Sequence, residues 1–175
     1  AITDRNTLAG VVRAHLAAKQ AELPLLIGAE ITPIDAPPCL LWVSDRTSYA
    51  ALCRVITQGR QRAEKGQCYL TLEDISQHSA SLLAGVIPYW TGPLQNAVAD
   101  SPFPIPSRPA TTDHLANYRD IFADRCYLVA ELHHGSHDQA RIELLRNFAQ
   151  RTQLPLVAAG NVHYHAAGRI ALHDV

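Results

Sequence analysis

Acidic and imidazole side chains follow several short apolar runs of the sequence, at the points where those runs end. In α/β folds the carboxyl ends of the strands gather functional side chains, whether the sheet is open or closed. Carboxylate and imidazole groups meeting at such an edge would suit a divalent-metal phosphoesterase, in which the metal activates water. The residues in these positions are Asp4, Glu30, His133, His134, Asn161 and His163.

Each of these residues also has a plain structural explanation. A glutamate at the end of a strand, such as Glu30, is more often a helix cap or an ion-pair partner than a metal ligand. His133 and His134 suit a polar turn, and His163 suits a structural histidine equally well. The shared position at one sheet edge, rather than any single residue, favours a site.

Near-continuous apolar runs predict the strands that would carry these residues. Such runs, alternating with helical patterns, indicate a parallel sheet covered on its faces, as an open sheet or as a barrel. The fold class is therefore α/β. The predicted strands are residues 1–4, 24–31, 39–43, 81–88, 126–131 and 154–159.

Helical spacing of apolar residues predicts three helices between these strands. Asn6 would cap a helix that runs to Gln20, and Ser44-Asp45 would cap a second that includes Ile56. The third carries apolar residues between 142 and 148. Strand and helix alternation resumes after the proline-rich segment 101–112, so that segment is predicted to be a surface loop and residues 1–175 a single domain. Both chain ends cut through predicted elements, so we expect a piece of a longer protein, truncated at both ends.

Composition narrows the functional classes. The 175 residues are 47% hydrophobic and 18% charged, with a net charge of −1, which argues against a module that binds nucleic acid by charge alone. The chain has no apolar stretch of about 20 residues and opens with no signal segment, so no membrane association is expected. The cysteines form no CxxC pair and lie mostly in apolar stretches, which predicts reduced, buried thiols and a cytoplasmic location. They are Cys39, Cys53, Cys68 and Cys126.

Three segments resemble the polymerase and histidinol phosphatase (PHP) domain family. AITDRNTLAG at 1–10, LIGAE at 26–30 and LVAAGNVHY at 156–164 occur in the order expected of such a domain. More narrowly, the chain resembles the PHP domain of error-prone DNA polymerases related to the bacterial polymerase III alpha subunit. The runs LAGVVRAH at 8–15 and YAALCRVIT at 49–57 are typical of that branch.

The resemblance implies a distorted (β/α) barrel of about seven parallel strands, here with its first strand missing. Relatives with activity hold up to three metal ions, partly through a His-x-His motif that would precede Ala1. Carried over residue by residue, the family's metal positions are Glu30, His134 and the final histidine, His163.

Two departures from the family pattern put these metals in doubt. Metal-binding members have Thr-Asp-His where this chain has Arg5 as the third residue, and Asp-x-His where it has Asn161. Arginine is a permanent cation without a ligand lone pair, and asparagine offers only a neutral carbonyl oxygen. We therefore expect a degraded site without its own cofactor. As a replacement for the metals, Arg5 is predicted to form an ion pair with Glu30 or a hydrogen bond with Asn161.

The resemblance implies that the longer protein is a DNA-directed DNA polymerase that copies damaged templates and causes damage-induced mutation. Its Mg²⁺-binding carboxylates would follow Val175, and the present chain would be a structural module that contacts DNA only through the rest of the polymerase. Two alternatives remain open. One is a free-standing metal-dependent phosphoesterase, and the other is a proofreading exonuclease with residual zinc or manganese at Glu30, His134 and His163. Both alternatives need a complete set of metal ligands, whereas the structural module does not.

Overall fold

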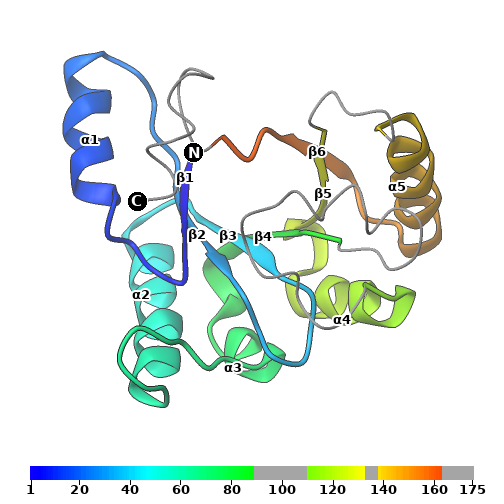
Figure 1. Cartoon of the computed structure of the whole chain (residues 1–175), viewed down its shortest axis with the longest axis horizontal. Coiled ribbons are helices and arrows are strands. Elements are labelled where there is room, and N and C mark those ends of the chain that lie inside the picture. The colour runs from blue at the N-terminus through cyan, green and yellow to red at the C-terminus, as the bar shows by residue number, and fades with distance from the viewer. Residues whose placement is uncertain (89–109, 133–137, 163–175) are drawn as a thin grey trace.

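The computed structural model describes residues 1–88, 110–132 and 138–162, and these form one curled sheet with helices around its outside (Figure 1). Neighbouring strands in the sheet are neighbours in the sequence. The strands are β1 (Ile2–Arg5), β2 (Ile27–Ile31), β3 (Cys39–Val43), β4 (Leu82–Val86), β5 (Cys126–Glu131) and β6 (Leu156–Ala159). The helices are α1 (Val11–Gln20), α2 (Arg46–Gln61), α3 (Leu72–Ser76), α4 (Thr112–Phe122) and α5 (Asp138–Thr152), with 3₁₀ turns η1 (Ser79–Ser81) and η2 (Ala123–Arg125).

The sheet is mixed, so the prediction of an all-parallel sheet is wrong. Strands β1 and β2, β4 and β5, and β5 and β6 pair in parallel, but β3 is antiparallel to both β2 and β4. The reason lies in residues 32–38, the connection from β2 to β3. Parallel neighbours need a crossover of about a dozen residues or more, and this connection is too short to provide one. The α/β class is confirmed, and the seven-stranded barrel with a missing first strand stays a prediction.

The main hydrophobic core lies between the sheet and its outer helices. Alternate strand residues such as Ile31, Leu41 and Leu128 point to this side and are fully buried. Leu52 of α2 and Leu115 of α4 pack against them. Burial of a side chain of this size stabilises the fold by about 1.5–3 kcal/mol, so this layer fixes the curvature of the sheet.

A smaller apolar cluster lies on the opposite, inner face of the curl. It contains Leu40 and Val129, with Trp42 packed against them. The Trp42 ring lies so close to Gly85 that a Cβ placed there would be 2.5 Å from it. The tryptophan therefore fills the inner side of the sheet, and a residue larger than glycine at 85 would displace it.

The first helix does not begin where the sequence predicts. Asn6 has a positive φ of 51° and hydrogen-bonds Thr32, with Asn6 Nδ2 2.6 Å from Thr32 Oγ1. Helix α1 starts only at Val11, where the backbone N–H of Gly10 donates to Asp4 Oδ2 over 2.7 Å. Asn6 therefore shapes the turn after β1 and does not cap α1, because its side chain is already used by the neighbouring strand end.

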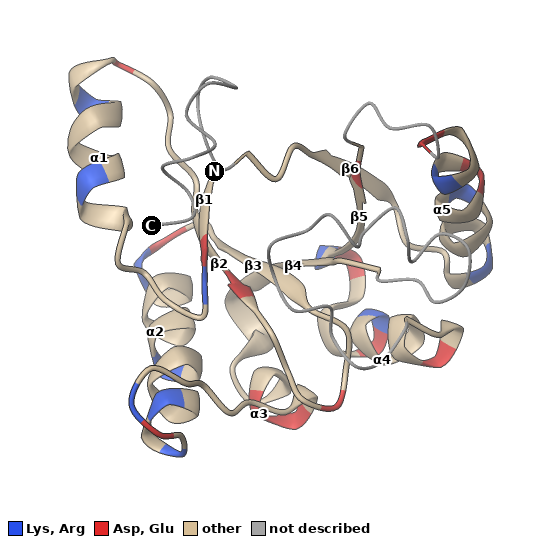
Figure 2. Cartoon of the chain, in the orientation of Figure 1, with Lys and Arg blue, Asp and Glu red and all other residues tan. Residues whose placement is uncertain are grey.

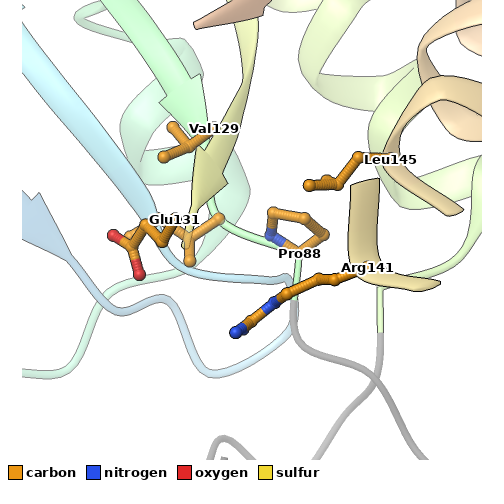
Figure 3. Close-up of a pocket in the computed structure, with 6 residues that line it drawn as sticks. Pro88, Val129, Glu131, Arg141 and Leu145 are labelled. Atoms are coloured by element: carbon orange, nitrogen blue, oxygen red, sulfur yellow. The ribbon is translucent and has the colours of Figure 1, made fainter. Parts of the chain in front are cut away.

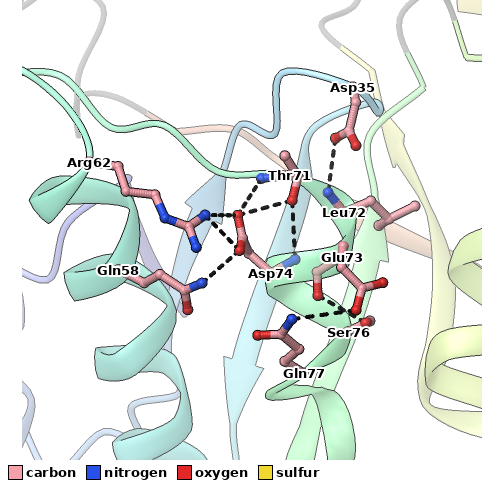
Figure 4. A network of polar contacts seen from close by, with 9 residues as sticks. All are labelled: Asp35, Gln58, Arg62, Thr71, Leu72, Glu73, Asp74, Ser76 and Gln77. Carbon is pink, nitrogen blue, oxygen red and sulfur yellow. Dashed lines mark hydrogen bonds and ion pairs between the residues drawn. The ribbon is translucent and has the colours of Figure 1, made fainter.

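A buried carboxylate joins α2 to α3 (Figure 4). Asp74 is 4% exposed and accepts hydrogen bonds from Gln58, Arg62 and Thr71. The Gln58 Nε2 and Arg62 Nη1 donors are 2.6 and 2.8 Å from Asp74 Oδ1. Burial opposes ionisation here, but the hydrogen bonds from Thr71 and Arg62 outweigh it and lower the pKa of Asp74. We call Gln58, Arg62, Thr71 and Asp74 the α2–α3 clasp.

The predicted cap of the second helix is confirmed, and two of the four cysteines are buried as predicted. Asp45 caps α2 through a reciprocal capping box with Ser48, as the Ser44-Asp45 pair predicts. All four cysteines are free thiols, but Cys53 and Cys68 are only half-buried. Within the described ranges, none of the helices combines the length and apolar character needed to span a lipid bilayer.

Candidate functional site

Three charged side chains lie on the inner face of the sheet, at the carboxyl ends of parallel strands. Arg5 ends β1 and lies opposite Glu30 in the pairing of β1 with β2. Glu131 ends β5, two residues after Val129 of the inner cluster. Side chains alternate between the faces of a strand, so all three lie on the inner side. We call this set the inner carboxyl edge.

Arg5 and Glu30 form the ion pair that the sequence analysis predicts. Arg5 Nε donates to Glu30 Oε1 over 2.9 Å, and the two side chains are 29% and 14% exposed. The pair joins the ends of β1 and β2 in addition to the backbone pairing of these strands. Glu30 therefore contacts a fixed cation at the position where the family pattern would place a metal ligand.

Asn161 contacts a different carboxylate. Its side-chain Nδ2 lies 3.5 Å from Glu131 Oε2, a long hydrogen bond. Of the two partners predicted for Arg5, Glu30 is thus the one in hydrogen-bond contact. Asn161 connects the segment after β6 to the end of β5 and brings a neutral donor to the inner carboxyl edge.

Glu131 is the most strongly perturbed carboxyl group of this edge. Its pKa is raised from the usual 4.5 to about 7, chiefly because burial disfavours the charged form, and further by the negative charge of Glu30. The positive charge of Arg141 acts in the opposite direction. Near neutral pH this carboxyl group is partly protonated, so it can either donate or accept a hydrogen bond.

Glu131 and Arg141 line a small pocket at the end of β5 (Figure 3). Pro88, Val129 and Leu145 supply its apolar wall. This apolar lining limits hydration of the carboxyl group, which explains why burial dominates its pKa shift. Sequence reasoning missed Glu131 as a site residue, although it ends a continuous apolar run in the same way as Glu30.

Asp4 does not join the inner carboxyl edge. It lies one residue before Arg5 in β1, so its side chain points to the other face. Its carboxylate accepts the Gly10 N–H, and a Cβ on Gly10 would lie 2.6 Å from Asp4 Oδ2. Asp4 therefore anchors the start of α1, which requires glycine at that contact.

The two predicted histidine positions, His134 and His163, lie outside the described residues, as does His133. Within residues 1–88, 110–132 and 138–162, no three side chains of the His, Cys, Asp and Glu types are grouped to hold a metal ion. The acidic groups at the edge are one glutamate paired with arginine and one glutamate with a raised pKa. In the described part of the chain, this edge therefore offers two carboxyl groups, of which Glu30 is engaged by Arg5.

Comparison with known proteins identifies the family. The PHP domain family matches residues 1–133. The error-prone DNA polymerase of Rhodopirellula baltica is 42% identical over 179 residues, which cover 99% of this chain. Error-prone DNA polymerases of Pseudomonas fluorescens Pf0-1 and Pseudomonas aeruginosa PAO1 are each 40% identical, again over 99% of this chain. The chain spans only 15% of the length of each of these relatives. With most of its length matched by the family, the chain belongs to the PHP domain family.

Proposed function

We propose that this chain is the PHP domain of an error-prone, DNA-directed DNA polymerase that copies damaged templates in the cytoplasm. The identity of 40–42% to proteins with that name, over 99% of the chain, supports the assignment. Nucleotidyl transfer, with its Mg²⁺ ions, belongs to sequence outside residues 1–175. Contact with DNA is made through that part of the longer protein.

Within the polymerase the PHP domain is a structural module with a degraded metal site. The observation that carries this proposal is the ion pair of Arg5 with Glu30, N to O 2.9 Å, at the carboxyl ends of β1 and β2. The Arg5 guanidinium supplies positive charge at the position where the family pattern has a metal ligand. A cation that is covalently part of the chain repels a dication and occupies a carboxylate oxygen that the metal would need.

The test is a metal analysis of the longer polymerase, paired with a phosphoesterase and 3′-exonuclease assay in added manganese or zinc. The expected result is a metal content near zero and no hydrolysis, with primer extension on damaged templates intact in Mg²⁺. Stoichiometric zinc or manganese, with hydrolysis lost in His163→Ala, would instead establish a working hydrolase or proofreading exonuclease.

A reversal variant sharpens the same test. Arg5→His combined with Asn161→Asp restores both residue types of the metal-binding pattern and removes the cation from the edge. We expect this double variant to bind zinc or manganese more tightly than the parent in equilibrium dialysis. Arg5→Lys combined with Asn161→Asp keeps the positive charge and is the matched control, for which we expect no such gain.

A further inference from the structure

Helix α1 is poorly supported by the rest of the described protein. It has ten residues, of which only Val11 is buried. Isolated helices shorter than about 12–15 residues are marginal in water, and helices in proteins gain most of their stability from packing of an apolar face. Apart from Val11, its anchor is the contact of Gly10 with Asp4 at its first turn.

The exposed side of α1 is apolar. Val12 and Leu16 are 69% and 62% exposed, and they are four residues apart, so they lie on one face of the helix. Leu23 and Leu26, in the segment that leads from α1 to β2, are 65% and 44% exposed. Single exposed leucines are ordinary on protein surfaces. A short helix whose large side chains are mostly exposed is a different case, because its own stability depends on covering them.

The charge around this face is mixed, because the exposed Glu22 follows α1 next to Leu23, while the helix itself carries only basic charged side chains. Arg13 and Lys19 are exposed, and α1 contains no acidic residue, as Figure 2 shows. Within the described ranges neither side chain takes part in an ion pair. Lys19 is three residues after Leu16, so it borders the apolar pair. The complementary surface therefore has an apolar centre that covers Val12 and Leu16.

We propose that the exposed face of α1, defined by Val12, Leu16 and Lys19, docks on the longer polymerase chain outside residues 1–175. This inference rests on the proposed function, because it takes the remainder of the polymerase as the occupant. The relatives are about seven times as long as the present chain, which spans 15% of them, so most of their surface lies outside it. Docking within one chain also needs little affinity, since the linked surfaces are present at high effective concentration.

The test places a photo-crosslinking residue, p-benzoylphenylalanine, at position 16 of the longer polymerase. The matched control places it at Ile34, which is 59% exposed in the connection from β2 to β3. After irradiation and digestion, mass spectrometry is expected to find crosslinks from position 16 to peptides beyond residue 175, several-fold more abundant than those from position 34. Primer extension by the same preparations tests the proposed function separately.

Three outcomes would overturn the inference. Crosslinks from position 16 only to peptides within residues 1–175 would show that this domain covers its own helix. A covalent dimer on a denaturing gel, with no intramolecular product, would identify a second copy as the occupant. Yields no higher than those at position 34 would show that the face is uncovered. Each of these with intact primer extension would leave the proposed function standing, and a preparation without primer extension would contradict that function whatever the crosslinks.

A charge variant gives a second readout that does not depend on crosslinking yield. Leu16→Glu puts a carboxylate into the proposed contact and is expected to raise the hydrogen-exchange rates of the α1 amides many-fold in the longer polymerase. Ile34→Glu is the control and is expected to leave those rates unchanged. Equal α1 exchange in the two variants would contradict docking.

Discussion

Asp74 is a buried carboxyl group and Glu131 a half-buried one, and their surroundings shift the two pKa values in opposite directions. Asp74 receives hydrogen bonds from a guanidinium, an amide and a threonine, and its pKa is lowered. Glu131 has one long hydrogen bond from Asn161 and an apolar pocket, and its pKa rises to about 7. Burial is the first cause in both cases, so the donors decide the outcome.

The difference distinguishes two regions: in the α2–α3 clasp hydrogen-bond donors stabilise the ionised carboxylate, and at the inner carboxyl edge burial favours the protonated form of Glu131. In the α2–α3 clasp, hydrogen-bond donors contact both oxygens of the Asp74 carboxylate. At the inner carboxyl edge a single guanidinium faces Glu30, while Glu131 lies close enough to Glu30 for the two charges to repel. An edge that keeps Glu131 at a cost to stability fits the proposal that it descends from a metal site.

The largest effect is expected from breaking the α2–α3 clasp. Asp74→Ala leaves the Gln58 amide and the Thr71 N–H without their acceptor, and we expect the free energy of unfolding to fall by about 3 kcal/mol. Asp120→Ala is the control, because Asp120 is 69% exposed and pairs with its chain neighbour Arg119. That control should change stability by less than about 0.5 kcal/mol. Urea denaturation measures both, and equal midpoints would show that the clasp is dispensable.

The ion pair of the inner carboxyl edge should contribute less than the clasp. Arg5→Ala leaves Glu30, 14% exposed, without its partner, and we expect a loss of about 2 kcal/mol because Arg5 itself is 29% exposed. A double-mutant cycle with Glu30→Ala isolates the pair. An unchanged melting temperature in Arg5→Ala would show that Arg5 does not replace the metals.

The smallest expected effect is the one at Glu131, and it depends on pH. The folded-state pKa of about 7 lies above the usual 4.5, so the folded protein holds a proton that the unfolded chain has released. Stability is therefore lost as the pH rises from about 4.5 to about 7. Glu131→Gln should remove this loss and stabilise the protein by about 1 kcal/mol at pH 8, allowing for solvent screening of a half-buried group, with no gain at pH 4.

Asp74 provides the matched comparison for that experiment. Its folded-state pKa is lowered, so its contribution is present above the unfolded value of 3.8 and is lost as the pH falls through the folded value. Asp74→Asn should therefore flatten the acid side of a stability profile, and Glu131→Gln the neutral side. Identical profiles for both variants would contradict the assignment of opposite shifts to the two groups.

Local sequence signals predict much of this fold. The runs Cys39–Val43 and Cys126–Glu131 are strands with the predicted bounds, because they are continuously apolar and end in polar residues. The helix α4 was missed, although Leu115, Tyr118 and Phe122 are buried at helical spacing after a Thr111 capping box. The antiparallel direction of β3 follows from the short connection between β2 and β3, which cannot form a crossover. The pattern of apolar residues within the strand does not indicate its direction.

At the candidate site, too, some features could be predicted from the sequence and others depend on tertiary contacts. The pairing of Arg5 with Glu30 could be predicted because Arg5 stands where the family pattern has a metal ligand, at the same sheet edge as the carboxylate of Glu30. The raised pKa of Glu131 could not, because it arises from burial in the pocket that Leu145 of α5 helps to line and from the negative charge of Glu30 in β2. The roles of Asn6 and Asp4 also depend on tertiary contacts. Asn6 hydrogen-bonds Thr32, and Asp4 accepts the Gly10 N–H.

The order of the strands bears on how the protein folds as it is synthesised. Since β1 to β6 are neighbours in space in the order of the sequence, each strand from β2 to β6 finds its preceding neighbour already made when it leaves the ribosome. Among the described strands, the sheet can therefore grow one strand at a time from the pair of β1 and β2. At elongation rates of about 5–20 residues per second, each pairing has seconds to form before the next strand arrives.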